Sequence, residues 1–255
     1  MMDREQQLRT EPLRVLITGA SSGLGEATAK LFAKRGATVS LLGRRPAELQ
    51  RVAGEIGTCA HIVVADVSDA LEVRNAVQSA VHAMGGLDVA VNAAGVAGNI
   101  ALEDLTEDHW HEVLQTNLSG TFYVAREAAL HMRRSGGGSI VNVASDLAAM
   151  GVPGLIHYCA AKAGVVGLTR AMAMELAPHV RVNVVCPGPI DTAMQRAELA
   201  AVPDPVEART LKERTVPLNR LADPDEVAAA IYFLAVDGTF ATGTSMAFDG
   251  GTSAA

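Results

Sequence analysis

Three residues near the middle of the chain have the types and spacing of an acid–base site. Tyr158 and Lys162 are four residues apart, so they share one face if this segment is helical. A nearby ammonium favours the phenolate, and we expect it to lower the pKa of Tyr158 towards the range that acid–base catalysis needs. Ser145 ends an apolar run thirteen residues earlier, where its hydroxyl could polarise a substrate oxygen. A Tyr–Lys pair alone is often an ordinary surface pair, so the serine strengthens the prediction.

A glycine-rich turn near the N-terminus has the composition of a phosphate-binding loop. The spacing of Gly19, Gly23 and Gly25 is G-x-x-x-G-x-G, which differs from the G-x-G-x-x-G of the usual dinucleotide fingerprint. Glycines leave room for a pyrophosphate, and the N–H groups of the following helix attract its charge. The alternative is a merely tight connection between strand and helix. The candidate cofactor contacts here are Gly19, Ser21, Ser22, Gly23, Leu24 and Gly25.

Two arginines bear on which cofactor would bind. In dinucleotide-binding folds a carboxylate about 20 residues after the turn holds the ribose of NAD, whereas an arginine suits the 2′-phosphate of NADP. Here Arg44 and Arg45 follow the second apolar run, and no carboxylate comes before Glu48. Charge-assisted hydrogen bonds from these arginines favour NADP(H), with NAD(H) as the alternative. In the latter case the arginines are only solvated surface charge.

The elements that must position these residues alternate along the chain. Strands are predicted over residues 15–18, 38–42, 61–65, 87–92, 139–144, 181–186 and 245–248. Helices are predicted over about 24–35, 46–57, 70–84, 107–134, 155–177 and 224–235. Continuous apolar strands separated by helices indicate a parallel sheet covered on both faces. Right-handed crossovers make this a doubly wound, Rossmann-like α/β fold whose carboxyl strand ends line the ligand crevice.

The remaining organisation is simple. We expect one domain over residues 14–255, preceded by a flexible arm over residues 1–13. The proline-rich stretch after the sixth strand is irregular in sequence, and residues 193–215 within it should form the substrate lid. Its apolar residues suggest a small or medium, fairly apolar carbonyl or alcohol as substrate. The candidate substrate contacts are Ser145, Leu147, Tyr158 and Met194.

Composition argues against several other classes of protein. The formal charge is −7 and no Lys/Arg-rich run occurs, so neither nucleic acid nor an anionic membrane is an expected partner. The three cysteines form no C-x-x-C pair, which favours reduced thiols in the cytoplasm. Neither a signal-peptide pattern nor a membrane-spanning apolar run is present. His109 and His111 have no third ligand in view, so no metal is expected.

Taken together, these motifs resemble those of the short-chain dehydrogenases/reductases, in the single-domain branch of about 250 residues. The resemblance runs from about Arg14 to Gly251. Its motifs are the glycine turn, Asp66-Val67, Asn92-Ala93-Ala94-Gly95, Asn117, Ser145, Tyr158 with Lys162, and Pro187-Gly188-Pro189-Ile190-Asp191-Thr192. The departures are small: Ala144 stands where the family often has a serine, and Cys159 follows the tyrosine.

The resemblance implies roles for these residues. Tyr158 would donate or accept the proton, Lys162 would bind the nicotinamide ribose, and Ser145 would orient the carbonyl. Asn117 would hold a water that links Lys162 to solvent. The remaining motifs would contact the cofactor: Asp66 and Val67 the adenine, Asn92, Ala93, Ala94 and Gly95 the cleft, and Pro187, Gly188, Ile190 and Thr192 the nicotinamide. The family also implies a homotetramer.

The expected function is therefore hydride transfer between a nicotinamide cofactor and a carbonyl or secondary alcohol carbon. One alternative is a cofactor-binding sensor that keeps the fold without turnover, although Ser145, Tyr158, Lys162 and Asn117 are all retained. Another is a lyase or epimerase, which would usually have a larger C-terminal substrate portion. A third keeps the same chemistry but uses NAD. Reduction of acyl-carrier-protein thioesters stays open but is not favoured.

Overall fold

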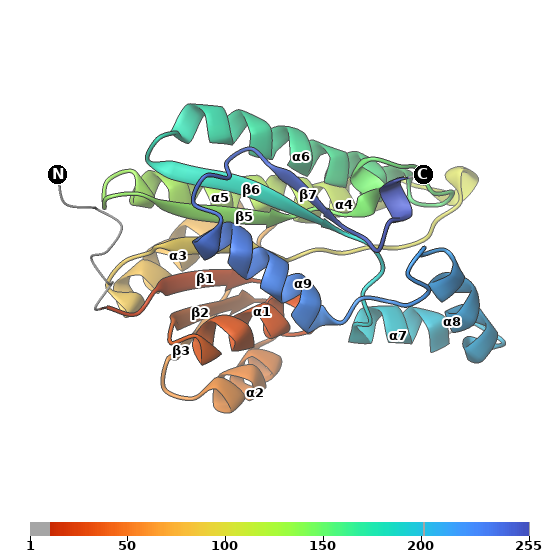
Figure 1. The fold of residues 1–255 in the computed structure, drawn as a ribbon, viewed down its shortest axis with the longest axis horizontal. Helices are drawn as coiled ribbons and strands as arrows, with labels where there is room; N and C mark the ends of the chain where they lie inside the picture. Colours follow the sequence, from red (N-terminus) through yellow and green to blue (C-terminus); the bar gives the residue numbers. More distant parts are fainter. Residues whose placement is uncertain (1–10, 201, 255) are drawn as a thin grey trace.

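The computed structural model describes residues 11–200 and 202–254, apart from the side chains of Met194 and Glu198. Within these residues, seven parallel strands form one sheet in the order β3-β2-β1-β4-β5-β6-β7 (Figure 1). The strands are β1 (Arg14–Thr18), β2 (Thr38–Gly43), β3 (Ala60–Val64), β4 (Val89–Asn92), β5 (Gly138–Val143), β6 (Val180–Pro187) and β7 (Ser245–Phe248). The order reverses direction between β1 and β4, so the predicted doubly wound sheet is confirmed.

Helices cover both faces of this sheet. One layer contains α1 (Gly23–Lys34), α2 (Pro46–Ile56) and α9 (Pro224–Tyr232), with α1 packed against α9. The other contains α3 (Ala70–Met84), α4 (Glu107–Leu114), α5 (Gly120–Met132) and α6 (Ile156–Leu176) (Figure 1). Two further helices, α7 (Ala193–Ala200) and α8 (Pro205–Arg214), lie beyond the carboxyl ends of the strands. Among the described residues, no helix combines the length and apolarity needed to cross a bilayer.

Alternate side chains of the central strand β1 enter different cores on the two faces of the sheet. Val15 and Ile17 of β1 pack with α1 and α9, whereas Leu16 between them packs with α3 and α5. All three side chains are fully buried. This two-residue alternation explains why the strands read as continuous apolar runs, since both faces of the sheet are covered.

Several helix ends form where the sequence predicts them. Asp223 begins α9 as N-cap, Pro224 follows at N1, and Glu226 completes a capping box. Gly36 follows the end of α1 with φ of 85°, a left-handed conformation that glycine adopts without a side-chain clash.

Two segments differ from expectation. The helix predicted over residues 107–134 is a continuous run in which a π-helical turn, Gln115–Ser119, separates α4 from α5. The segment expected to be irregular instead contains α7 and α8, because Asp204 caps the second of these helices and Pro205 starts it. At the N-terminus, residues 1–10 of the predicted arm lie outside the described chain, while the carbonyl oxygen of Leu13 already accepts a hydrogen bond from Thr38.

Candidate active site

Most of the sequence-predicted site residues lie at the carboxyl edge of the parallel sheet. The turn after β1 and the start of α1 hold the glycines, the end of β4 and the residues after it are 92–95, and Ser145 follows β5. β6 ends at Pro187, and the segment after it leads into α7 at the same edge (Figure 1). These are the strand ends at which ligands bind in open parallel sheets.

The glycine turn depends on close backbone contacts. Gly19 has φ of 67°, and a Cβ atom there would lie 2.9 Å from the carbonyl oxygen of Ala93. A Cβ on Gly25 would collide with the backbone of Gly19. Glycines therefore allow the turn to fold back on itself and to pack against the segment that follows β4.

The start of α1 has the open character of an anion-binding site. Ser22 occupies the N-cap position but makes no side-chain hydrogen bond to the helix, whereas Asp69, Asp204 and Asp223 each cap theirs. The first amides of α1 are consequently not satisfied by the side chain of their own N-cap residue. These amides and the helix dipole suit the pyrophosphate of a dinucleotide.

The two arginines near this turn have different partners. The guanidinium of Arg45 donates hydrogen bonds to the hydroxyl groups of Ser21 at 2.9 Å and Ser22 at 2.8 Å. Arg44 approaches Asp66 instead, with 3.5 Å between its Nη1 and the carboxylate Oδ2. Asp66 also accepts hydrogen bonds from Ser68, and its pKa lies below the usual value because these bonds and Arg44 outweigh its burial.

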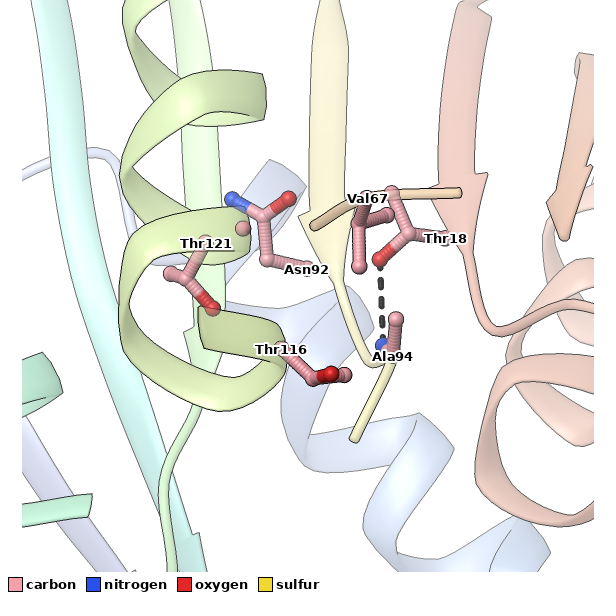
Figure 2. Close-up of a pocket in the computed structure, with 7 residues that line it drawn as sticks. Thr18, Val67, Asn92, Ala94, Thr116 and Thr121 are labelled. Atoms are coloured by element: carbon pink, nitrogen blue, oxygen red, sulfur yellow. Dashed lines mark hydrogen bonds between the residues drawn. The ribbon is translucent and has the colours of Figure 1, made fainter. Parts of the chain in front are cut away.

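Thr18, which sequence analysis did not single out as a separate contact, fixes the segment after β4. Its hydroxyl oxygen accepts the N–H groups of Ala93 at 3.1 Å and Ala94 at 3.0 Å. Figure 2 shows Thr18, Asn92 and Ala94 around a small pocket that Val67 also lines. The predicted cofactor residues Val67, Asn92 and Ala94, which lie after β3, at the end of β4 and after β4, are thus brought together beside Thr18.

Asn117 lies in the π-helical turn and is fully buried. Its side-chain oxygen accepts the N–H of Val96 at 3.0 Å, and its amide nitrogen donates to the carbonyl of Val96 at 2.8 Å. A Cβ on Gly95 would lie 2.6 Å from the Asn117 Oδ1 and 3.7 Å from the Nζ of Lys162. A side chain at Gly95 would therefore clash with the amide of Asn117, which Val96 holds in place, while the Lys162 Nζ is only at contact distance.

Tyr158 and Lys162 share a face of α6, as their spacing predicts. The ammonium nitrogen of Lys162 lies 5.5 Å from the centre of the Tyr158 ring and donates to the carbonyl of Val143 at 2.9 Å. Burial lowers the pKa of Lys162 to about 8.

The expected lowering of the Tyr158 pKa is not found in the structure. Burial raises the pKa of this phenol to about 12, and a hydrogen bond with Ser145 offsets only part of the rise. The expectation was wrong because the loss of water around the phenol outweighs its favourable contacts.

Ser145 follows β5 in an extended conformation and is 8% exposed. Its hydroxyl donates to Asp146 Oδ1 at 2.8 Å, and its oxygen accepts the N–H of Leu147 at 3.2 Å. Asp146, itself only 7% exposed, is a residue that the sequence analysis missed. A carboxylate beside a candidate serine was visible in the sequence, but its burial and its bond to the serine were not.

A buried chain of polar side chains connects the sheet to α6. The amide of Asn92 donates to Asn142 at 2.8 Å, and the amide of Asn142 donates to Thr169 at 2.9 Å. Thr169 in turn donates to the carbonyl of Val165. Among the described residues the Asn92 Oδ1 atom at the end of this chain has no hydrogen-bond partner, but the bonds from Asn92 to Asn142 and from Asn142 to Thr169 link β4 and β5 to α6. Asn142 and Thr169 are therefore positioning residues that the motifs did not reveal.

The segment after β6 approaches the glycine turn. A Cβ on Gly23 would lie 3.3 Å from Cγ2 of Thr192, so the predicted cofactor residues on these two segments are neighbours. Asp191 forms ion pairs with Arg196 of α7 and Arg209 of α8, which tie both helices of the predicted lid to this segment. Of the predicted substrate contacts, Leu147 is partly buried beside Ser145, and the side chain of Met194 lies outside the described part of the chain. No three His, Cys, Asp or Glu side chains gather as metal ligands among the described residues.

Known proteins are similar to this chain over nearly its whole length. Residues 19–253 match the family model described as Enoyl-(Acyl carrier protein) reductase. The chain is 38% identical to a 3-oxoacyl-(acyl-carrier-protein) reductase of Thermotoga maritima, covering 96% of this chain and 99% of that one. It is 41% identical to the cis-4-hydroxycyclohexanecarboxylate dehydrogenase of Sinomonas cyclohexanicum, covering 94% and 96%. A solved variant of the actinorhodin polyketide ketoreductase with NADPH superposes with a TM-score of 0.90 at 33% identity, covering 95% and 97%.

Fold, site and relatives define a nicotinamide-dependent oxidoreductase that acts on CH–OH or C=O groups. The chain belongs to the short-chain dehydrogenase/reductase family.

Proposed function

We propose that this protein transfers a hydride between NADP(H) and a carbonyl or secondary alcohol carbon, with Tyr158 as general acid or base. The observation that carries the proposal is the convergence of two sites at one edge of the sheet. One is the start of α1, without a side-chain cap, beside Arg45, and the other is the group formed by the buried Ser145 and Lys162 with the half-buried Tyr158. The first suits a phosphorylated cofactor and the second suits proton transfer.

The described residues fit a nicotinamide dinucleotide. The amides of α1 would hold its pyrophosphate, and Arg45 with the hydroxyl groups of Ser21 and Ser22 would hold the 2′-phosphate. Asp66 and Val67 would face the adenine, and Ile190 and Thr192 the nicotinamide. When bound, the reduced cofactor supplies the hydride that adds to the substrate carbon.

The remaining steps belong to the side chains at the other end of the crevice. Tyr158 gives its phenolic proton to the oxygen of a carbonyl, or takes it back from an alcohol. Ser145 donates a hydrogen bond to the same oxygen. Lys162 holds the cofactor ribose, and the raised pKa of Tyr158 keeps the phenol protonated at neutral pH, ready for reduction. Asn117 holds a water between Lys162 and solvent.

We propose a small or medium, fairly apolar substrate that enters beneath α7 and α8. The names of two relatives support oxidation or reduction at a carbon–oxygen bond. Their substrates differ in size: one is a 3-oxoacyl thioester and the other a hydroxylated cyclohexane ring. Leu211 of the predicted lid is 54% exposed, so an apolar substrate would gain contact area if α8 closed on it. A screen with 4-oxocyclohexanecarboxylate, unsubstituted cyclic ketones and a 3-oxoacyl thioester distinguishes these classes.

We also propose a homotetramer that works in the cytoplasm. Phe122 and Leu130 on α5 and Met174 on α6 expose apolar side chains that a subunit contact would cover. The cysteines Cys59, Cys159 and Cys186 are free thiols, as expected in a reducing compartment. Light scattering after size-exclusion chromatography should give four times the chain mass, and a monomer would contradict the assembly.

A binding titration tests the cofactor assignment. We expect NADPH to bind more tightly than NADH, and Arg45→Ala to weaken NADPH by about tenfold or more through loss of charge-assisted hydrogen bonds. NADH binding should change little. The matched control is Arg133→Ala, which removes an exposed arginine at the C-terminal end of α5. It should change the binding of neither NADPH nor NADH. Equal binding of both cofactors by wild type would assign the arginines to surface charge and favour NAD.

A further inference from the structure

The buried carboxyl group of Asp146 lies next to the proposed catalytic serine. Asp146 begins the short 3-10 turn Asp146–Ala148 that follows β5, and its side chain is turned into the protein. Its Oδ1 atom accepts two hydrogen bonds, from the Ser145 hydroxyl at 2.8 Å and from the Leu147 N–H at 2.9 Å. Both bonds join it to the residues that border the reacting carbonyl in the proposed function.

A serine hydroxyl has only one hydrogen to donate. In the structure that hydrogen is donated to Asp146 Oδ1. An ionised carboxylate is only an acceptor, and its hydrogen bond with a hydroxyl is stronger than one between neutral groups. A charged Asp146 therefore competes with the substrate for the one hydrogen of Ser145.

The charges around Asp146 determine how readily it gains a proton. Asp249, which follows β7, raises its pKa, whereas Lys212 of α8 lowers it. Tyr158 of α6 and Cys186 of β6 also lie within range of its charge. The largest influence is burial, and the net effect is a pKa above the ordinary value of an aspartate, despite the bonds from Ser145 and Leu147.

We propose that Asp146 is a positioning residue that controls the hydroxyl of Ser145: the charged carboxylate holds the serine hydrogen, and a proton on Asp146 releases it to the substrate oxygen. This proposal rests on the role given to Ser145 in the proposed function. A protonated Asp146 donates to the oxygen of Ser145, and the hydrogen of Ser145 turns to the carbonyl. Both residues keep their protons during the reaction, because Tyr158 supplies the proton that the product alcohol gains.

The hydrogen bond itself is tested without any substrate. The protein is labelled with ¹³C at the aspartate carboxyl carbons and titrated by NMR, and the signal missing in Asp146→Asn identifies Asp146. We expect this signal to titrate above the ordinary aspartate value of about 4. In Ser145→Ala the pKa should rise further, because the bond that favours the charged form is lost. Titration at or below the ordinary value, or no change in Ser145→Ala, would overturn the proposal.

Single-turnover reduction, measured by the loss of NADPH absorbance with a ketone from the screen, tests the consequence. The rate of reduction by wild type should fall as pH rises through the pKa of Asp146. The rate of Asp146→Asn should not change over the same pH range, and at pH 8 it should exceed the wild-type rate by about tenfold. In a Ser145→Ala background the same substitution should change the rate less than twofold. A merely structural Asp146 would instead give parallel pH profiles, or an effect that persists without Ser145, and either result would refute the proposal.

The two experiments distinguish a failure of the proposed function from a failure of the role proposed for Asp146. If no ketone is reduced, the proposed function fails, while the NMR titration still decides whether Asp146 and Ser145 are coupled. If ketones are reduced but the pH profiles of wild type and Asp146→Asn coincide, the proposed function stands and the role of Asp146 is wrong.

Discussion

The glycine turn and the proposed catalytic segment, which carries Ser145, Tyr158 and Lys162, lie at the same edge of the sheet but are built by different means. Around the turn, glycines bring backbone amides close together, and the side chains of Arg44 and Arg45 reach solvent. After β5 and on α6, Ser145, Asp146 and Lys162 are buried, and burial shifts the pKa values of Asp146, Tyr158 and Lys162. Backbone amides and exposed charges suit binding, whereas buried groups with shifted pKa values suit proton transfer.

This difference predicts that binding and chemistry can be separated by substitution. A change in the turn should alter cofactor affinity or the stability of the loop contacts. A change in the catalytic segment should alter turnover and its dependence on pH. The following substitutions test the separation.

The largest effect is expected at Tyr158. Tyr158→Phe keeps the ring and removes the proton that the carbonyl oxygen needs, so turnover should fall by about 10²–10⁴-fold. The dissociation constant for NADPH should change by less than about threefold, since the turn is untouched. Retained turnover would eliminate Tyr158 as the acid, and a large loss of affinity would show that the two regions are coupled.

Gly19→Ala tests the glycine turn. The left-handed backbone of residue 19 and the clash of the added methyl group with Ala93 should together lower the free energy of unfolding by about 4 kcal/mol, and NADPH affinity should clearly fall. Gly36→Ala is the matched control: φ there is 85°, but no atom lies within 4 Å of the added methyl group. The control should cost only about 1–2 kcal/mol and leave cofactor binding intact. Denaturant unfolding and fluorescence titration measure both, and equal costs at the two glycines would show that the close approach is unimportant.

Lys162 links stability to pH. Its pKa is lowered to about 8 in the folded chain from a usual 10.5, so between these values the unfolded chain binds more protons. Wild type should therefore gain stability relative to Lys162→Met as pH rises from about 8 to 10.5, by about 3 kcal/mol at most. Lys34→Met, at the exposed end of α1, should show no such trend. Stability curves that run parallel for wild type and Lys162→Met would mean that the lysine is not buried as described.

The sequence revealed more of the binding region than of the catalytic one. Glycine spacing and the Arg44–Arg45 pair are local patterns, and the Tyr158–Lys162 pair follows from helical periodicity. The parallel sheet followed from continuous apolar runs, because covering both faces of a strand leaves no polar alternation. These features are set by neighbouring residues, so a reader of the sequence can find them.

The features that were missed depend on residues far apart in the chain. The pKa of Tyr158 depends on how much surrounding protein excludes water, and the importance of Asp146 on its burial beside Lys212 and Asp249. The chain from Asn92 through Asn142 to Thr169 joins three elements. In the predicted lid, α8 was hard to find in the polar sequence because it is only weakly amphipathic, and its start depends on the Asp204 cap and Pro205.

The most direct test of the central claim follows the hydride itself. NADPH carrying deuterium at C4, prepared separately in each of the two stereochemical forms, is mixed with excess protein and each compound of the carbonyl screen, and the alcohol product is analysed by mass spectrometry. We predict that one of the two forms transfers deuterium to the former carbonyl carbon of at least one ketone, and that Tyr158→Phe transfers none in the same time. If NADPH binds but no deuterium reaches any substrate carbon, the protein is a cofactor-binding sensor on this fold, and the assignment as a catalyst is wrong.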